Sequence, residues 1–102
     1  MKRLPPVHPG EVLLEDFMKP HGLTPYRVAK DIGVPALRIH QIVKRARGIS
    51  ADTALRLARY FETSAEVWVR MQARYELEVA QAELERRINK EVKIFRATQR
   101  AA

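Results

Sequence analysis

The chain has 102 residues, which is room for one domain and too few for a two-domain enzyme. Its 46% hydrophobic and 30% charged residues are typical of a chain that folds. Aliphatic runs of at most three residues exclude a membrane span, and no secretory signal opens the sequence, so we expect a cytoplasmic protein. Nineteen Lys and Arg residues against twelve Asp and Glu residues give a net charge of +7, which favours an anionic polymer as the partner.

The first predicted helix begins at Pro9. His8 is expected to cap it, with Glu11 folding back onto the backbone N–H of His8. The Pro and Gly in Lys19–Gly22 predict its end. The apolar residues that share its inner face are Val12, Leu13, Phe17 and Met18.

Two short helices are predicted next, separated by only three or four residues. Thr24 caps the first, Pro25–Ile32, and Gly33 closes it in a left-handed conformation. Pro35 opens the second. Two helices that cross this closely need a small residue at the contact, a Gly at the reversal and aliphatic inner faces. The residues that meet these needs at helix-turn-helix spacing are Val28, Ala29, Ile32, Gly33, Val34, Ile39 and Ile42, and Val43 extends the apolar stripe of the second helix.

Ser50 and Ser64 are predicted to cap two more helices. The core positions of the earlier one are Ala54, Leu57, Ala58 and Phe61. The later one carries Trp68, Met71 and Tyr75 and then Leu77, Leu84, Ile88, Val92 and Phe95, so one long helix is the simplest interpretation. Because Glu91–Phe95 also alternates like a strand, the conformation past Asn89 stays open. We therefore predict an all-α fold of five helices with a helical C-terminal extension, divided into a DNA-binding domain at 8–80 and a basic extension at 81–102 that contacts a second copy or another partner.

Positive charge is concentrated around the second of the two short helices. Residues 24–50 contain six Lys and Arg residues and one acidic residue, whereas residues 51–85 contain four basic and seven acidic residues. If Ile39 points inward, helical periodicity turns Leu37, Gln41 and Lys44 directly outward, with Arg38, His40 and Arg45 beside them. The sequence therefore predicts that the face around Leu37 and Gln41 enters the major groove of double-stranded DNA.

Specific roles follow for this face. Gln41 can pair with N6 and N7 of adenine, and Arg38 can reach guanine or a phosphate. An exposed Leu37 is unfavourable in water but can pack on a thymine methyl group; the alternative is that it packs against the first helix. Phosphate contacts are predicted for Thr24, Arg27, Lys30, Lys44, Arg45 and Arg47, although any single Lys or Arg can be an ordinary surface charge.

These residues resemble the Cro/repressor-type helix-turn-helix domain of HigA-type antitoxins, also called the VapI group. The resemblance covers about residues 8–80 and implies a homodimer that binds a palindromic operator, represses its own operon and neutralises a HigB-type mRNA-cleaving toxin. Ala36 stands where the wider class commonly contacts a base, but it offers no polar group, and Pro35 replaces a frequent Ser or Thr cap, so the operator sequence does not carry over. The residues that carry the resemblance are His8–Glu11, Ala29, Ile32–Val34, Ile39, Gln41–Val43, Arg47–Arg59, Thr63–Trp68, Gln72 and Tyr75–Leu77.

Other classes of function have weaker support. His8, His21 and His40 lie on different predicted elements, cysteine is absent, and there is no glycine-rich phosphate loop, so we expect no enzyme, metal, cofactor or small-molecule substrate. Trp68 and Tyr75 are expected in the core or a dimer contact rather than under RNA bases. The few large apolar residues after 86 disfavour a membrane-bound tail. A solitary phage-type repressor without a toxin stays open, and the neighbouring gene would distinguish it from an antitoxin.

Overall fold

The fold is all-helical, as predicted, in a computed structural model that describes residues 4–97. Between those residues there are five α-helices and no strand: α1 (Pro9–Val12), α2 (Pro25–Ile32), α3 (Ala36–Val43), α4 (Ala51–Phe61) and α5 (Ala65–Glu91). After α1 the chain continues as a π-helix (Leu13–Met18) and a 3-10 helix (Lys19–His21). The predicted bounds of α2 and the caps at Thr24, Ser50 and Ser64 are confirmed.

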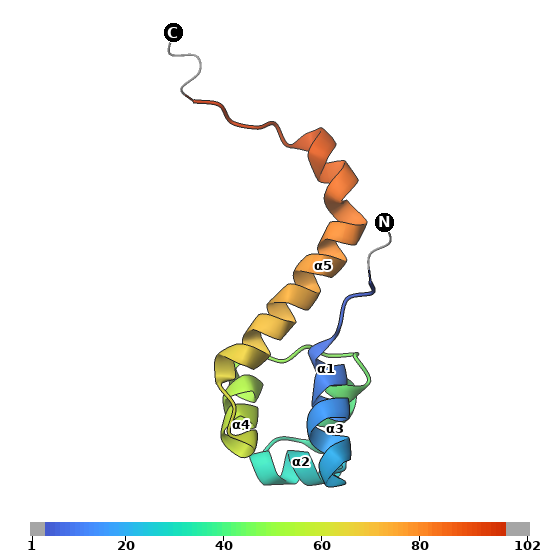
Figure 1. Ribbon diagram of the computed structural model, residues 1–102, viewed down its shortest axis with the longest axis vertical. Helices are drawn as coiled ribbons and strands as arrows, with labels where there is room; N and C mark the ends of the chain where they lie inside the picture. The colour runs from blue at the N-terminus through green and yellow to red at the C-terminus, as the bar shows by residue number, and fades with distance from the viewer. Residues whose placement is uncertain (1–3, 98–102) are drawn as a thin grey trace.

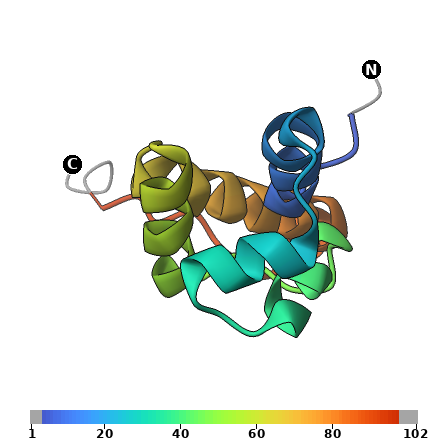
Figure 2. The same ribbon diagram turned by 90° about the horizontal axis from the view of Figure 1, so that it is seen from below.

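The molecule is elongated because α5 runs away from the other helices (Figure 1), and its extents are 64 × 28 × 22 Å. A view along the long axis shows the short helices gathered at the near end, with α5 behind them (Figure 2). None of the helices in residues 4–97 has the length and apolar character that crossing a membrane requires. Helices α2 and α3, which form the predicted helix-turn-helix pair, therefore lie at one end of the long axis.

The N-terminal helix departs from the prediction in two ways. The imidazole Nδ1 of His8 accepts the backbone N–H of Gly10 at 2.8 Å, so His8 is the cap, but the Glu11 carboxylate pairs with Arg45 instead of folding back. The chain also widens into the π-helix after Val12. In an α-helix, residues five apart diverge by about 140°, whereas the wider π-turn brings them to one face. Leu13 and Met18 are both fully buried as a result.

The core lies where α1–α4 meet the first turns of α5. Its buried hydrophobic residues are Leu13, Met18, Val28, Ala29, Ile32, Ile39, Ile42, Ile49, Ala54, Leu57 and Trp68. The indole N–H of Trp68 donates to the Thr63 hydroxyl at 2.9 Å, and its ring centroid lies 5.1 Å from that of Phe17. Gly10 lies so close to α3 that a Cβ there would sit 1.8 Å from the carbonyl oxygen of Ile42. Helix α1 therefore packs directly against the inner side of α3.

The distal part of α5, from residue 77 onward, extends beyond the core. Every side chain described from residue 81 to residue 97 is exposed, although the helix is continuous through residue 80, where we predicted a domain boundary. The helix ends at Glu91 and Val92 is extended, with φ −104° and ψ 121°. This segment therefore gains little stability from tertiary packing, and its helix continues from the part of α5 that packs on the core.

Acid should destabilise the fold through His8. Its cap requires an unprotonated Nδ1, and burial, reinforced by the charge of Arg45, lowers the pKa of His8 although Glu11 opposes the shift. A folded-state pKa below the unfolded value means that the stabilisation is complete above pH 6.5 and is lost as pH falls from there through the folded-state pKa. We expect the free energy of unfolding, measured by chemical denaturation between about pH 5 and 8, to fall with acid.

His8→Asn is the matched control for this effect. Asn keeps a cap acceptor but does not titrate, so the pH dependence should be flatter than in the wild-type chain. The other titrating groups are common to both proteins. Equal slopes in the two proteins would assign the acid sensitivity to those groups and not to the cap.

Candidate nucleic-acid interface

The second helix of the pair, α3, has a buried face and an exposed face. Ile39 and Ile42 are fully buried, whereas His40 and Lys44 are exposed. The preceding turn is formed by residues 33–35, in which Gly33 has φ +76°, the left-handed conformation that glycine adopts without strain. Amphipathic spacing and this turn together fix which face of α3 meets solvent.

Leu37 lies on the exposed face. Its side chain is 63% exposed, so the alternative that it packs against the first helix is wrong. Ala36, one residue earlier, is half-buried and packs on the margin of the core. An exposed leucine in a charged neighbourhood is thus available for an apolar contact with a partner.

Gln41 is less free than the sequence predicted. It is half-buried, and its Oε1 is buried without a hydrogen-bond partner within the described part of the chain. The expectation that Gln41 points directly outward is therefore met only in part, because its side-chain oxygen is buried. Leaving such an acceptor unpaired costs about 1 to 3 kcal/mol.

Arg38 is held by α4 and does not extend freely into solvent. Its Nη1 lies 3.1 Å from Asp52 Oδ2 and 3.5 Å from Thr53 Oγ1, and the side chain is only 27% exposed. The sequence predicted Arg38 beside the outward face but missed this partner. The i, i+4 spacing of Asp52 and Arg56 predicts an ion pair within one helix. Nothing in the sequence indicated that Asp52 would also meet Arg38 on α3.

The predicted phosphate contacts lie on several elements around α3. Thr24 Oγ1 accepts the backbone N–H of Arg27 at 3.1 Å, so this cap already uses one of the free amides of α2. The basic residues that are exposed in this region are Arg27, Lys30, Lys44, Arg45 and Arg47. They lie on α2 and in the loop that follows α3, and exposed positive charge near α3 in the chain suits an anionic backbone.

Two of these arginines already have carboxylate partners. Arg27 Nε lies 2.7 Å from Asp31, and Arg45 lies 3.4 Å from Glu11. The Tyr60 hydroxyl also donates to Asp31, and this bond together with that from Arg27 lowers the pKa of the Asp31 carboxyl. Such exposed pairs are weak, so a phosphate group can replace the carboxylate at little cost.

The loop after α3 is anchored by α5. Gln72 Oε1 accepts the backbone N–H of Ile49 at 2.8 Å, and Gln72 Nε2 donates to Glu76. A Cβ on Gly48 would lie 2.7 Å from the Gln72 amide, so a larger residue here would displace that side chain from its present position. The loop that carries Arg45 and Arg47 is therefore fixed relative to the long helix, a contact that the sequence analysis missed.

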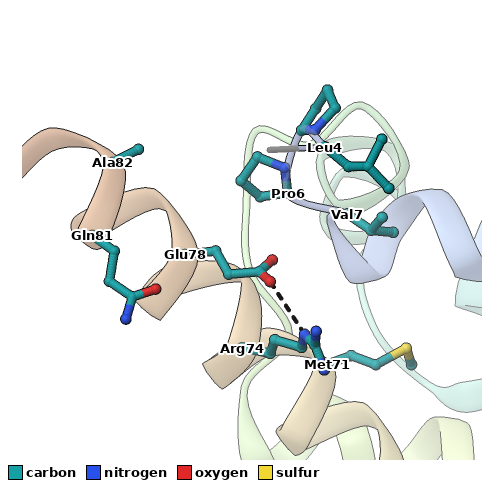
Figure 3. A pocket seen from close by; sticks show the side chains of 9 residues that line it. Leu4, Pro6, Val7, Met71, Arg74, Glu78, Gln81 and Ala82 are labelled. Atoms are coloured by element: carbon teal, nitrogen blue, oxygen red, sulfur yellow. Dashed lines mark hydrogen bonds and ion pairs between the residues drawn. The ribbon is translucent and has the colours of Figure 1, made fainter. Parts of the chain in front are cut away.

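A groove of about 810 Å³ lies between the N-terminal segment and α5, on the side of the long helix (Figure 3). Leu4, Pro6 and Val7 form one wall, and Met71, Arg74, Glu78, Gln81 and Ala82 form the other. Arg74 and Glu78 pair across one turn of α5 at 3.3 Å. In residues 4–97, no three His, Asp or Glu side chains cluster in a way that could hold a metal ion.

Comparisons with known proteins agree on the class of protein. No family model matches the chain. Virulence-associated protein I of Dichelobacter nodosus is 49% identical over 78 residues, which is 76% of this chain and 72% of that protein. The structure of Pseudomonas aeruginosa antitoxin HigA with the higBA promoter is 40% identical, covers 89% of this chain and 99% of that one, and has a TM-score of 0.87. An addiction module antidote protein of the HigA family from Coxiella burnetii is 37% identical, covers 90% and 100% of the two chains, and has a TM-score of 0.86.

Proposed function

The chain belongs to the HigA family of helix-turn-helix antitoxins, and on that premise we propose that it binds an operator in double-stranded DNA as a homodimer and represses its own operon. The relatives are antitoxins and transcription regulators, so the chain is a regulator and not an enzyme. Its place of action is the cytoplasm, where the DNA of an operon lies.

The observation that carries this proposal is the exposed face of α3. A helix whose inner residues are fully buried presents Leu37 at 63% exposure, with Lys44 and Arg47 exposed close by in the chain. A rigid helix with an apolar tip and a basic border matches the major groove, which offers thymine methyl groups between two phosphate backbones. Without a partner, an exposed leucine among charged side chains contributes nothing to stability.

Within this face, each predicted residue has a distinct role. Gln41 rotates outward to pair with N6 and N7 of adenine, and the pairing satisfies the Oε1 that is buried and has no partner among residues 4–97. Leu37 packs on a thymine methyl group, and Arg38 reads guanine or a phosphate. Ala36 and His40 flank these readers, and the half-buried Ala36 contributes only an apolar contact.

Phosphates are bound by the residues around α3. Thr24 and the N-terminus of α2 approach one backbone, while Arg27 and Lys30 lie on the same helix. Lys44, Arg45 and Arg47 approach the other from the loop after α3. These contacts set the register of the protein on the duplex and carry no base specificity.

The second copy packs on the distal part of α5. Leu77, Leu84 and Ile88 fall within about 40° of one another on the helix, and all three are exposed. The stretch 76–85 contains four acidic residues and no basic one, whereas 86–96 contains five basic residues and one acidic residue. Two antiparallel copies therefore bring opposite charges together around an apolar centre, which is the self-complementarity that a twofold interface requires.

The toxin partner is a HigB-type mRNA-cleaving enzyme encoded beside this chain. The alternative is a solitary phage-type repressor that has no toxin. Co-purification with the product of the adjacent gene distinguishes the two: a stable complex that still protects the upstream promoter supports the antitoxin. Footprinting by this chain alone, with no toxin-like neighbour, supports the solitary repressor.

Gln41→Ala tests the base-reading role directly. We expect a loss of about 1 to 3 kcal/mol on the operator and little change on random DNA, because a bidentate base pair contact is removed. Lys44→Ala is the control and should weaken binding to both DNAs similarly, because a phosphate contact is independent of sequence. Fluorescence anisotropy titrations of the wild-type protein and both variants, at one salt concentration, give the six affinities that the comparison needs. Equal losses on both DNAs for Gln41→Ala would remove this residue from the reading role.

A further inference from the structure

Asp52, in the first turn of α4, lies between two arginines from different parts of the fold. Its Oδ2 is 3.1 Å from Arg38 Nη1 on α3, and its two oxygens are 3.2 and 3.1 Å from Arg56 Nε. Arg56 Nη1 in turn donates to the backbone carbonyl of Ile32 at 2.8 Å, at the C-terminus of α2. The Asp52 carboxylate therefore connects α3 to α4 and, through Arg56, to the turn between α2 and α3.

Arg38 is more restricted by its contacts than Arg27 and Arg45 are by theirs. Arg38 is 27% exposed, whereas the side chains of Arg27 and Arg45 are 63% and 62% exposed although each has a carboxylate partner. Arg38 also lies 3.5 Å from the hydroxyl of Thr53, which is almost fully buried. An arginine that is already held loses less rotamer freedom when it binds a partner.

The negative charge of Asp52 also opposes the binding of DNA in general. Its side chain is 57% exposed beside the α3 face, so it repels any phosphate backbone that approaches in the wrong alignment. The same carboxylate thus fixes the direction of Arg38 and penalises complexes in which Arg38 meets no partner. The first effect strengthens binding to the operator and the second weakens binding to random DNA, so both raise the ratio of the two affinities.

We propose that Asp52 is a specificity-determining positioning residue, which aims Arg38 at the operator and opposes binding to other sequences. This inference rests on the proposed function, because it assumes that α3 faces DNA. In this proposal Asp52 acts through its contact with Arg38 and not by binding a base.

Asp52→Asn is the test, because it removes the charge and keeps the size of the side chain. The operator probe is a duplex enriched by the wild-type protein from a random-sequence pool, and the pool itself is the non-specific reference. We expect weaker operator binding, stronger binding to the pool, and a fall of about tenfold in the ratio of the two affinities. Asp16→Asn removes the same charge from the π-helix and should leave the ratio unchanged.

A double-mutant cycle separates positioning from overall stability. In an Arg38→Ala background, Asp52→Asn should no longer weaken operator binding, because the residue that it positions is gone. Unfolding midpoints of all variants show that the comparison is made between folded proteins. An equal gain on both DNAs, an equal loss on both DNAs, or a persisting operator loss in the Arg38→Ala background would overturn the proposal. A wild-type protein that enriches no sequence would instead overturn the proposed function.

Discussion

Operator affinity should fall by about 10³ to 10⁵ when the salt concentration rises from about 50 to 200 mM. Each Lys or Arg that neutralises a phosphate releases a condensed counterion, and a dimer that uses these residues contacts roughly 6 to 10 phosphates. The side chains expected to supply the contacts are Arg27, Lys30, Lys44, Arg45 and Arg47, all of which are exposed. Titrations at four or more salt concentrations give the slope of log affinity against log salt.

Lys44→Ala provides the internal standard for this slope. It should lower the slope by about 1 for each substituted side chain, because one phosphate contact is lost per protomer. Gln41→Ala should leave the slope unchanged, because a base contact releases no counterion. A flat response of the wild-type protein would mean that backbone phosphates contribute little, and the electrostatic part of the proposal would be wrong.

Leu84→Glu combined with Ile88→Glu should abolish the dimer and weaken operator binding by about 10² to 10⁴. The two residues lie one turn apart on the exposed distal part of α5, and a charge at each position would be desolvated in the interface. A monomer can contact only one half-site, so the gain from binding two linked half-sites is lost. Sedimentation at micromolar concentration measures the mass, and anisotropy on the operator measures the affinity.

Ala82→Glu is the matched control for charge on the same helix. Ala82 is exposed and lies roughly opposite Leu84 around the helix, at about 160°. This variant should remain dimeric and keep its affinity for the operator. If the double variant is still a dimer, the interface lies elsewhere on the molecule, and the proposed role of the α5 stripe is wrong.

Local sequence determined the helices of this protein and which face of α3 is exposed. Caps at Thr24, Ser50 and Ser64 and the left-handed Gly33 act over a few residues, so their effect could be predicted from neighbours in the chain. Helical periodicity placed Leu37 on the outer side of α3, because 100° per residue fixes which side chains share a face, and the structure then excluded packing against the first helix. The distal part of α5 was likewise indicated by spacing, although its end at Glu91 was not.

Tertiary structure alone decided the partners of the polar side chains. Arg38 meets Asp52 across 14 positions of sequence, Arg45 meets Glu11 across 34, and Gln72 meets Ile49 across 23. Periodicity gives the direction in which a side chain leaves its own helix, but a hydrogen bond depends on how two helices are packed. The same limit explains Gln41, which leaves α3 in the predicted direction and is then half-buried by its surroundings. The sequence by itself therefore determined the family and the exposed face of α3, and only the tertiary structure decided which side chains on that face already have partners within the protein.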